Sequence, residues 1–239
     1  GAECEPYITA DNRTMLEETD DIVEGIKLVK QYMELSEVII GVEDNKPEAI
    51  AKLQAAVAGL DGVSVKSLKA QYPQGGEKVL IYECTGKIVP EGKLPSDVGC
   101  VVLNVSTIAF IARYMHTGMP LVTKRVTVDG DAIAEPKNVE VPIGATFGDI
   151  IDFCGGFKTE PKKIIMGGPM MGFAVPTLDY PVLKNHNAIL AFSAEKTAEA
   201  EAPETPCIRC ARCVNACPLG LMPAAIEKAF NAGDVDALK

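Results

Sequence analysis

Four cysteines near the carboxyl end of the sequence have a spacing that suits a metal centre. They lie in the run Cys207-Ile-Arg-Cys-Ala-Arg-Cys-Val-Asn-Ala-Cys-Pro, which has the pattern C-x2-C-x2-C-x3-C-P. Thiolates separated by two residues converge on one centre when the loop wraps around it. A cubane iron–sulfur cluster requires that wrap, with backbone amides turned toward its sulfides. The spacing therefore predicts that Cys207, Cys210, Cys213 and Cys217 are cluster ligands.

Two other kinds of site use closely spaced cysteines. Zinc sites usually take two Cys pairs from separated segments, so three ligands within residues 207–213 fit zinc poorly. A redox-active C-x-x-C pair needs neither the third nor the fourth cysteine. In two-cluster ferredoxins, three cysteines of one run hold one cluster and the fourth holds the other. We therefore expect Cys207, Cys210 and Cys213 to share a cluster whose fourth ligand is not in this sequence, and Cys217 to serve a second cluster.

Weaker signals for ligand binding lie in the first half of the sequence. The run Gln74-Gly-Gly-Glu-Lys can bring backbone amides close to a phosphate or a flat ring, because glycine permits close approach; a plain surface turn is the alternative. The acids of Glu3-Cys-Glu-Pro suit either a binding site or a solvated surface. Asn104 follows a predicted strand, so we expect a helix N-cap first and a ligand contact second.

Two further features are more ambiguous still. The run Met166-Gly-Gly-Pro-Met-Met-Gly-Phe predicts a flexible apolar loop that serves either docking or packing between domains. His116 and His186 lack spaced metal-ligand partners, which favours structural roles. The remaining cysteines are expected to be small buried hydrophobic residues; they are Cys4, Cys84, Cys100 and Cys154.

Hydrophobic periodicity predicts the elements that position the groups of the first half. The alternation of helices and strands with short loops is typical of a parallel, right-handed α/β layer. The predicted elements are a helix from Asp20, a strand over 37–42, a helix capped by Asn45, a strand over 63–68, a helix over 79–84, a strand over 100–103 and a helix over 105–117.

From Leu121 the hydrophobic period changes to two. Strands over 122–128 and 138–141 flank the turn signal Asp129-Gly130, and a third strand covers 163–166. Between them, Thr146 and Asp149 form a capping pair for a short helix over 147–153. This order predicts a small α+β domain that is β-grasp-like in outline. Residues 195–206 contain no core-forming residue larger than Ala and are expected to form a solvated linker.

The composition is that of an ordinary globular protein, and it limits the classes of function. Of the 239 residues, 47% are hydrophobic and 23% are charged, with a net charge of −10. Residues 1–60 carry 13 acidic and 5 basic side chains, which argues against a nucleic-acid surface. The longest apolar stretch, 98–112, is interrupted by polar residues and is shorter than the ~20 residues of a membrane-spanning helix. No signal peptide is visible, and the cysteine usage indicates a reducing, cytoplasmic setting.

Taken in order, five segments resemble the C subunit of Rnf-type electron-transport complexes, which is similar to the flavin-binding subunit of respiratory complex I. The resemblance implies a Rossmann-like FMN/NADH domain over 1–118, an SLBB-type β-grasp domain over 119–175, a linker over 176–204 and the first half of a ferredoxin-like domain over 205–239. The segments are Gly1-Ala-Glu-Cys-Glu-Pro-Tyr-Ile-Thr-Ala-Asp, Tyr72-Pro-Gln-Gly-Gly-Glu-Lys, Leu103-Asn-Val-Ser-Thr, Met166-Gly-Gly-Pro-Met-Met-Gly and the Cys207–Pro218 run.

The resemblance also implies cofactors and residues that contact them. The cofactors are FMN, NAD(H) and, in the full-length protein, two [4Fe–4S] clusters. No catalytic residue is assigned. The residues expected to contact flavin or nucleotide are Glu3, Glu5, Tyr72, Gly75, Gly76, Glu77 and Asn104. Replacement of Glu77 by glutamine is expected to change nucleotide affinity.

Two segments of the family pattern lie outside this sequence. The glycine-rich loop that holds the flavin phosphate belongs before Gly1, and the second cysteine run belongs after Lys239. Because a phosphate site without its loop loses most of its amide donors, we expect this sequence to be a fragment, incomplete at the N-terminal end of its first domain. We expect the fragment by itself to bind clusters poorly and to be inactive.

The function implied is that of the subunit through which electrons enter a membrane-bound, ion-translocating NAD:ferredoxin oxidoreductase, at the cytoplasmic face of the bacterial cell membrane. Its expected partners are NADH and the other Rnf-type subunits, including integral membrane ones, with no nucleic acid and no membrane-spanning segment of its own. A soluble corrinoid-reducing iron–sulfur flavoprotein with the same order of modules is the alternative. A non-catalytic docking scaffold stabilised by metal is the alternative of another class.

Overall fold

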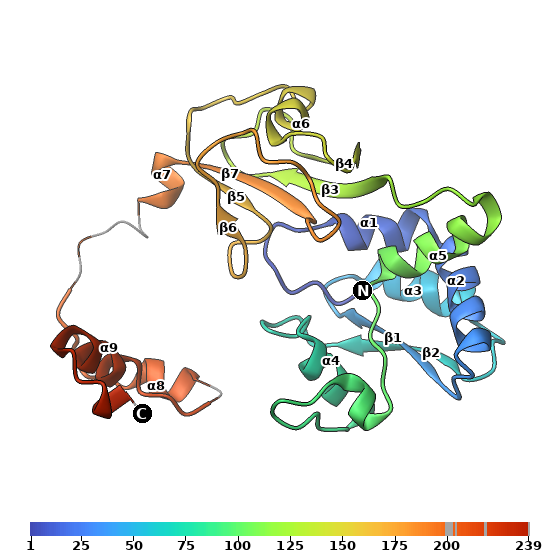
Figure 1. Ribbon diagram of the computed structural model, residues 1–239, viewed down its shortest axis with the longest axis horizontal. Helices are drawn as coiled ribbons and strands as arrows, with labels where there is room; N and C mark the ends of the chain where they lie inside the picture. The colour runs from blue at the N-terminus through green and yellow to red at the C-terminus, as the bar shows by residue number, and fades with distance from the viewer. Residues whose placement is uncertain (199–202, 204, 218, 239) are drawn as a thin grey trace. The chain divides into compact units, whose positions relative to one another are not determined.

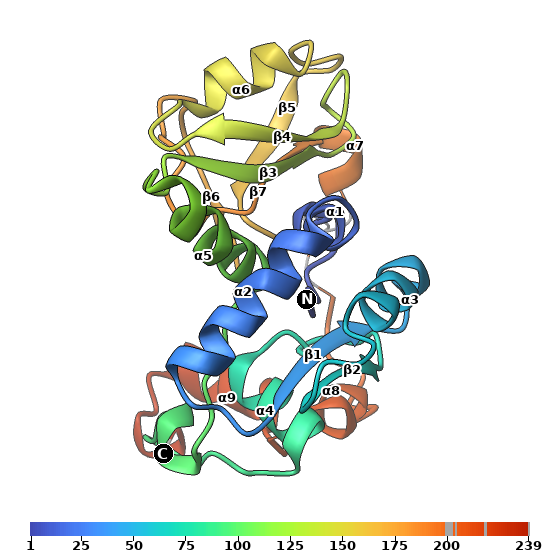
Figure 2. The same cartoon turned by 90° about the vertical axis from the view of Figure 1, so that its right-hand side faces the viewer.

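The chain forms two compact units. The computed structural model describes residues 1–198, 203, 205–217 and 219–238. The first unit covers Gly1–Thr197 and the second covers Ala198–Lys239 (Figure 1). In the first unit, a layer of helices that contains α1, α2 and α5 lies between two separate sheets (Figure 2).

The front half of the first unit alternates helices with two parallel strands. β1 and β2 pair in parallel, with Val38 opposite Val63, as the α/β pattern predicts. The elements in chain order are α1 (Ala10–Glu17), α2 (Thr19–Tyr32), β1 (Val38–Glu43), α3 (Pro47–Ala56), β2 (Val63–Leu68), α4 (Glu77–Thr85), η1 (Pro95–Val98) and α5 (Val105–Thr117).

Local capping explains several of these boundaries. Pro47 stands in the first turn of α3, where a missing backbone N–H costs nothing. The Asn104 side chain accepts a hydrogen bond from the backbone N–H of Ser106 and caps α5, which ends at left-handed Gly118. The predicted strand over 100–103 is wrong, because the structure assigns no regular element there. α1 is an addition that the sequence did not predict.

The close crossing of α2 and α5 depends on one glycine. A Cβ built on Gly25 would lie 2.1 Å from the carbonyl oxygen of Ile108, so the backbones of the two helices meet there. Gly25→Ala is therefore expected to lower the free energy of unfolding by about 3 kcal/mol, despite the higher helix propensity of alanine. Chemical denaturation measures this change. Gly148→Ala is the matched control, since its Cβ would meet its nearest neighbour, Leu178 Cβ, at an ordinary 3.5 Å; equal losses at both sites would contradict the prediction.

The back half of the first unit is a five-stranded sheet with one covering helix. The strand order is β4-β3-β7-β5-β6, and the β3–β7 pair is parallel whereas the other pairs are antiparallel. The elements are β3 (Thr123–Asp129), β4 (Lys137–Pro142), α6 (Phe147–Phe153), β5 (Pro161–Met166), β6 (Phe173–Ala174), β7 (Ala188–Ser193) and α7 (Ala194–Thr197).

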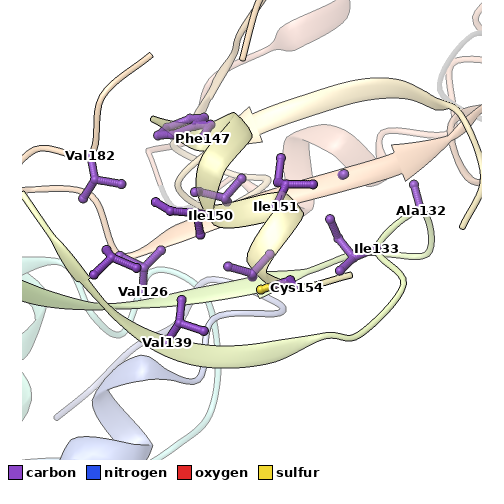
Figure 3. Packing of buried hydrophobic residues seen from close by; sticks show 13 residues of the cluster. Val126, Ala132, Ile133, Val139, Phe147, Ile150, Ile151, Cys154 and Val182 are labelled. Atoms are coloured by element: carbon purple, nitrogen blue, oxygen red, sulfur yellow. The ribbon is translucent and has the colours of Figure 1, made fainter. Parts of the chain in front are cut away.

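The core of this half lies between α6 and the sheet. Phe147, Ile150 and Ile151 of α6 belong to one buried cluster with Val126 and Val139 of the strands (Figure 3). The predicted capping pair is present, because the backbone N–H of Asp149 donates to Thr146 Oγ1 at the start of α6. The mixed α/β fold class is thus confirmed for the first unit.

The segment 176–204 is not simply a linker. It contains β7, the middle strand of the sheet, whose six residues Ala188–Ser193 are all buried. A fully buried strand shows no apolar–polar alternation, so its sequence lacks the pattern that identifies half-buried strands. The helix α7 also occupies the first residues of the stretch 195–206, for which the sequence predicts a solvated linker. Residues 199–202 and 204 of that stretch lie outside the described part of the chain.

Ion pairs and hydrogen bonds join the two halves of the first unit. Arg125 on β3 pairs with Glu17 at 2.8 Å and with Glu18 at 2.9 Å, at the junction of α1 and α2. The backbone N–H of Thr9 donates to Thr127 Oγ1 at 3.0 Å. These contacts fix the N-terminal segment against the second sheet, and this arrangement positions the pocket discussed below.

The second unit is short and helical. It contains α8 (Arg212–Ala216), α9 (Pro223–Ala232) and η2 (Asp236–Leu238). Pro218, which ends the cysteine motif, lies outside the described residues. In the portion of the chain that is described, helices long and apolar enough to cross a membrane are absent.

Candidate functional site

A pocket of about 590 Å³ opens where three segments of the first unit meet. Ala2–Glu5 precedes α1, Tyr72–Gly76 precedes α4, and Met166–Phe173 contains the turn between β5 and β6. No lysine or arginine occurs among the described residues that line the pocket, while three acids do: Glu3, Glu5 and Asp11. The remaining lining residues include Cys4, Ile8, Tyr72, Pro73, Gly75, Gly76, Asn104, Gly168, Met171, Gly172, Phe173, Asn185, His186 and Asn187.

The carboxyl group of Glu3 has a pKa above its usual value. Its carboxylate accepts hydrogen bonds from the backbone N–H of Glu5 and from Asn187 Nδ2, both at 2.9 Å. Burial raises the pKa of Glu3 to about 7, and the negative charges of Asp11, Glu5 and Glu43 act in the same direction, whereas the Glu5 N–H lowers it. Glu3 is therefore a group that gains and loses a proton near neutral pH at the wall of the pocket.

Glu5 is held by the back half of the unit. Its Oε2 accepts from the backbone N–H of Met170 at 2.9 Å, and its Oε1 accepts from that of Met171 at 2.7 Å. A Cβ built on Gly168 would lie only 2.1 Å from Glu5 Oε2. The carboxylate thus occupies the space that a side chain at Gly168 would fill.

Asn104 serves the fold and the pocket together. While its Oδ1 caps α5, its Nδ2 donates to Asp11 Oδ2 at 2.7 Å. Asp11 is buried and also accepts from Ser106 Oγ at 3.3 Å. The N-cap prediction for Asn104 is confirmed, and the same side chain lines the pocket.

The glycines before α4 allow two chain segments to pack closely. A Cβ on Gly75 would meet the carbonyl oxygen of Ala2 at 2.8 Å and Cys4 Sγ at 3.2 Å. Gly76 precedes α4 and lines the pocket with Gly75. Tyr72 also lines the pocket, with 46% of its surface exposed. Glycine here permits approach to the N-terminal segment as well as to any ligand.

The structure does not bring every predicted residue to the pocket. Glu77 is exposed in the first turn of α4 and is not among the lining residues. Several residues that sequence reasoning did not select do line it, among them Asp11, His186 and Asn187. Asn187 is 184 positions from its partner Glu3, so no local pattern could have identified it.

The imidazole of His186 lines this pocket and accepts a hydrogen bond. The backbone N–H of Leu183 donates to its Nδ1 at 3.1 Å, which places the ring proton on Nε2. Burial lowers the pKa of His186, and the positive charge of Lys124 lowers it further. Its ring also packs edge-on against the ring of Phe147, with 6.0 Å between the ring centroids. His186 therefore also has the structural role that the sequence favours for it.

A second cavity, of about 260 Å³, lies beside β1. Its walls are mainly apolar side chains of α2, β1, α4, α5 and the segment 99–103, together with Cys84 and Cys100. Binding sites combine apolar walls with a few convergent polar groups. The larger pocket, with its acids, amides and imidazole, fits that description better.

The cysteine run forms a turning loop in the second unit. Cys207, Cys210 and Cys213 are exposed, and Arg209 and Ala211 adopt left-handed conformations with φ of 57° and 60°. Such residues turn successive amides to one side, which suits an anionic sulfide. Across the described residues, however, no three Cys, His, Asp or Glu side chains lie close enough to hold a metal ion. The residue types and the turns fit a cluster, while the thiols are not gathered around one point.

Two family profiles and several curated proteins resemble the chain. Residues 1–113 match the Nuo51 FMN-binding domain and residues 125–174 match the SLBB domain. The C subunit of the proton-translocating ferredoxin:NAD(+) oxidoreductase complex of Clostridium ljungdahlii is 49% identical over 227 residues, which is 95% of this chain and 49% of that protein. The C subunit of the Na(+)-translocating ferredoxin:NAD(+) oxidoreductase complex of Acetobacterium woodii is 46% identical over 95% of this chain and 51% of that protein.

The chain thus spans about half the length of these two relatives. Among solved structures, a crystal structure of an NAD+-reducing NiFe hydrogenase in the H2-reduced state is similar, with a TM-score of 0.66 and 19% identity. The match covers 82% of this chain and 40% of that one. At this identity the likeness concerns the fold alone. The ferredoxin-like expectation for residues 205–239 stays a prediction.

Proposed function

This chain belongs to the family of the C subunits of Rnf-type electron-transport complexes, and from that membership we propose that it passes electrons between NAD(H), FMN and [4Fe–4S] clusters. The whole protein is then one component of a membrane-bound, ion-translocating NAD:ferredoxin oxidoreductase. Its partners are NADH and the other subunits, integral membrane ones included, and it works at the cytoplasmic face of the membrane. Ion translocation belongs to those other subunits.

The pocket of the first unit is the proposed nucleotide site. When bound there, FMN supplies the exchange between hydride and single-electron chemistry. The exposed ring of Tyr72 and the apolar Met171 and Phe173 give a flat ring surfaces to pack against. Glu3 would hold or release a proton at the wall of the pocket, and the Nε2–H of His186 would be a further donor. Because the pocket lacks a basic side chain among its described residues, it suits a ring better than phosphates.

The cysteine run is the proposed cluster site. Cys207, Cys210 and Cys213 would hold one [4Fe–4S] cluster, and Cys217 would ligate a second. Arg209 and Ala211, which lie between the cysteines, adopt the left-handed conformation, and such residues help a loop to wrap an anionic group. The proposed limits of the first domain remain 1–118, and the second domain, expected over 119–175, is extended to include β7 (Ala188–Ser193).

The observation that carries the nucleotide proposal is the convergence of distant predicted residues on one pocket. Glu3, Tyr72, Gly75 and Asn104 come from three separate segments, with Tyr72 and Gly75 on the same one, and all line it. Calorimetric titration of the chain with FMN and with NADH tests the proposal. We expect saturable binding of at least one of them, abolished when Asn104→Ala and Gly75→Val are combined. Absence of binding at millimolar ligand would contradict the proposal.

Glu77→Gln serves as a separate test of which acids matter. Because Glu77 is exposed and lies outside the pocket lining, its charge is screened by solvent. We expect this variant to change nucleotide affinity by less than about twofold, in place of the clear change that the sequence resemblance implies. Titration of the variant beside the wild type measures this. A change of tenfold or more would place Glu77 at the ligand.

A further inference from the structure

The turn between β5 and β6 reaches from the second sheet to the pocket of the front half. Residues 167–172 connect the two strands, and Phe173 pairs with Met166 where the strands begin to separate. Within the described part of the chain, two hydrogen bonds join this turn to the front half. Both run from backbone N–H groups, of Met170 and Met171, to the carboxylate of Glu5. The hydrogen bonds that hold the turn to the front half thus depend on one side chain, that of Glu5.

The chemistry of this contact requires both carboxylate oxygens. Each oxygen accepts one amide, and hydrogen bonds to a charged acceptor are stronger than neutral ones. Gly168 leaves the space in which the carboxylate lies, since a Cβ there would overlap Glu5 Oε2 at 2.1 Å. Glu5 is itself oriented by its own N–H, which donates to Glu3 Oε1 at 2.9 Å. Glu3 therefore helps to position Glu5, and Glu5 in turn positions the turn.

The turn and the first residue of β6 present apolar side chains that are largely exposed. Met171 is 71% exposed and Phe173 is 69% exposed, and both line the pocket. A polarizable thioether and an aromatic ring are favourable neighbours for a flat heteroaromatic ligand. Tyr72 offers a second aromatic surface from the front half. A nicotinamide or flavin ring in the pocket would bury part of this apolar area.

We propose that the 167–172 turn is a wall of the nucleotide site that contacts the ring of the bound ligand, and that Glu5 is the positioning residue that fixes this wall. This inference rests on the proposed function of the pocket. It gives the second domain a direct part in binding and gives Glu5 a role that acts through Met170 and Met171 rather than through contact with the ligand.

Methionine methyl resonances in the full chain provide the test, with FMN and NADH as the probes. We expect the Met171 methyl signal, assigned with Met171→Leu, to shift on addition of at least one probe. Met119, which is exposed and lies outside the pocket lining, is the internal control and should not move. In Glu5→Gln, amide exchange at Met170 and Met171 should be about tenfold faster, and probe affinity should fall about fivefold. Glu77→Gln is the matched control and should retain the wild-type amide exchange at Met170 and Met171 and the wild-type probe affinity.

The outcomes separate this inference from the proposed function. If neither probe binds the wild-type chain, both are overturned. If a probe binds and the Met171 signal stays unchanged, the wall is overturned while the proposed function stands. If Glu5→Gln has wild-type amide exchange and affinity, Glu5 is not the positioning residue. Gly168→Ala, which displaces the carboxylate without removing it, must weaken binding as Glu5→Gln does; wild-type behaviour of that variant also overturns the inference.

Discussion

Replacing Cys210 with serine is expected to remove most of the iron that the full-length protein retains after anaerobic reconstitution. A thiolate is the ligand that iron in a cubane cluster requires, and a hydroxyl is a much weaker one. We expect at least about a tenfold loss in retained iron and sulfide for the affected cluster, since even changes outside the ligand shell weaken metal sites by that factor. Iron and acid-labile sulfide per protein are the quantities to measure.

Cys100→Ser is the matched control for this experiment. Cys100 is half-buried beside the smaller cavity of the first unit, so its loss should leave the iron content unchanged. Unchanged iron in Cys210→Ser would contradict the ligand assignment. Zinc in place of iron in the wild-type protein would contradict the cluster itself.

The affinity for NADH is expected to fall about tenfold between pH 5 and pH 9, and Glu3→Gln should abolish most of that fall. Below about pH 7 Glu3 is largely protonated, whereas above it the carboxylate adds a negative charge to a pocket that also contains Glu5 and Asp11. A factor of ten corresponds to one pKa unit of coupling between proton and ligand. Calorimetric titrations at several pH values measure the profile.

Two comparisons make this prediction specific. NAD+ carries a cationic ring, so its affinity should decline less with rising pH than that of NADH. Glu77→Gln should keep the wild-type profile, because that residue is solvent-exposed. A profile that is the same in Glu3→Gln and in the wild type would contradict the role of Glu3.

The same proton also affects stability. A carboxyl group whose pKa is raised on folding binds its proton more tightly in the folded state. The free energy of unfolding should therefore decline as the pH rises from about 4.5 to about 7, by on the order of 2 kcal/mol after allowance for partial exposure. Glu3→Gln should flatten this part of the stability profile. The effect is separable from binding because it needs no ligand.

Local signals predict much of the fold. Asn104 and Thr146 cap their helices because the capping hydrogen bonds involve residues only two or three positions away. α1 is not predictable in this way, because its buried face includes polar Asp11 and Thr14, which break the apolar periodicity. The apolar run over 100–103 has the composition of a strand, yet it has no strand partner. β7 lacks alternation because it is buried on both faces.

The site is less predictable than the elements, because its decisive contacts join residues far apart in the chain. Glu5 and Met171 are 166 positions apart, and Glu3 and Asn187 are 184 apart. The resemblance to a family identifies Glu3 and Glu5 as site residues, but their partners depend on how the second sheet packs against the front half. No pattern in either segment contains that information.

Electron exchange between a nucleotide in the first unit and iron–sulfur clusters in the second is the central expectation for this protein. Anaerobic visible and electron-paramagnetic-resonance spectra of the full-length protein, recorded with and without NADH, test it most directly. We predict that NADH bleaches a flavin-like absorption and produces a low-temperature signal of reduced clusters. A colourless protein, or a coloured one whose spectra do not change with NADH, would contradict it.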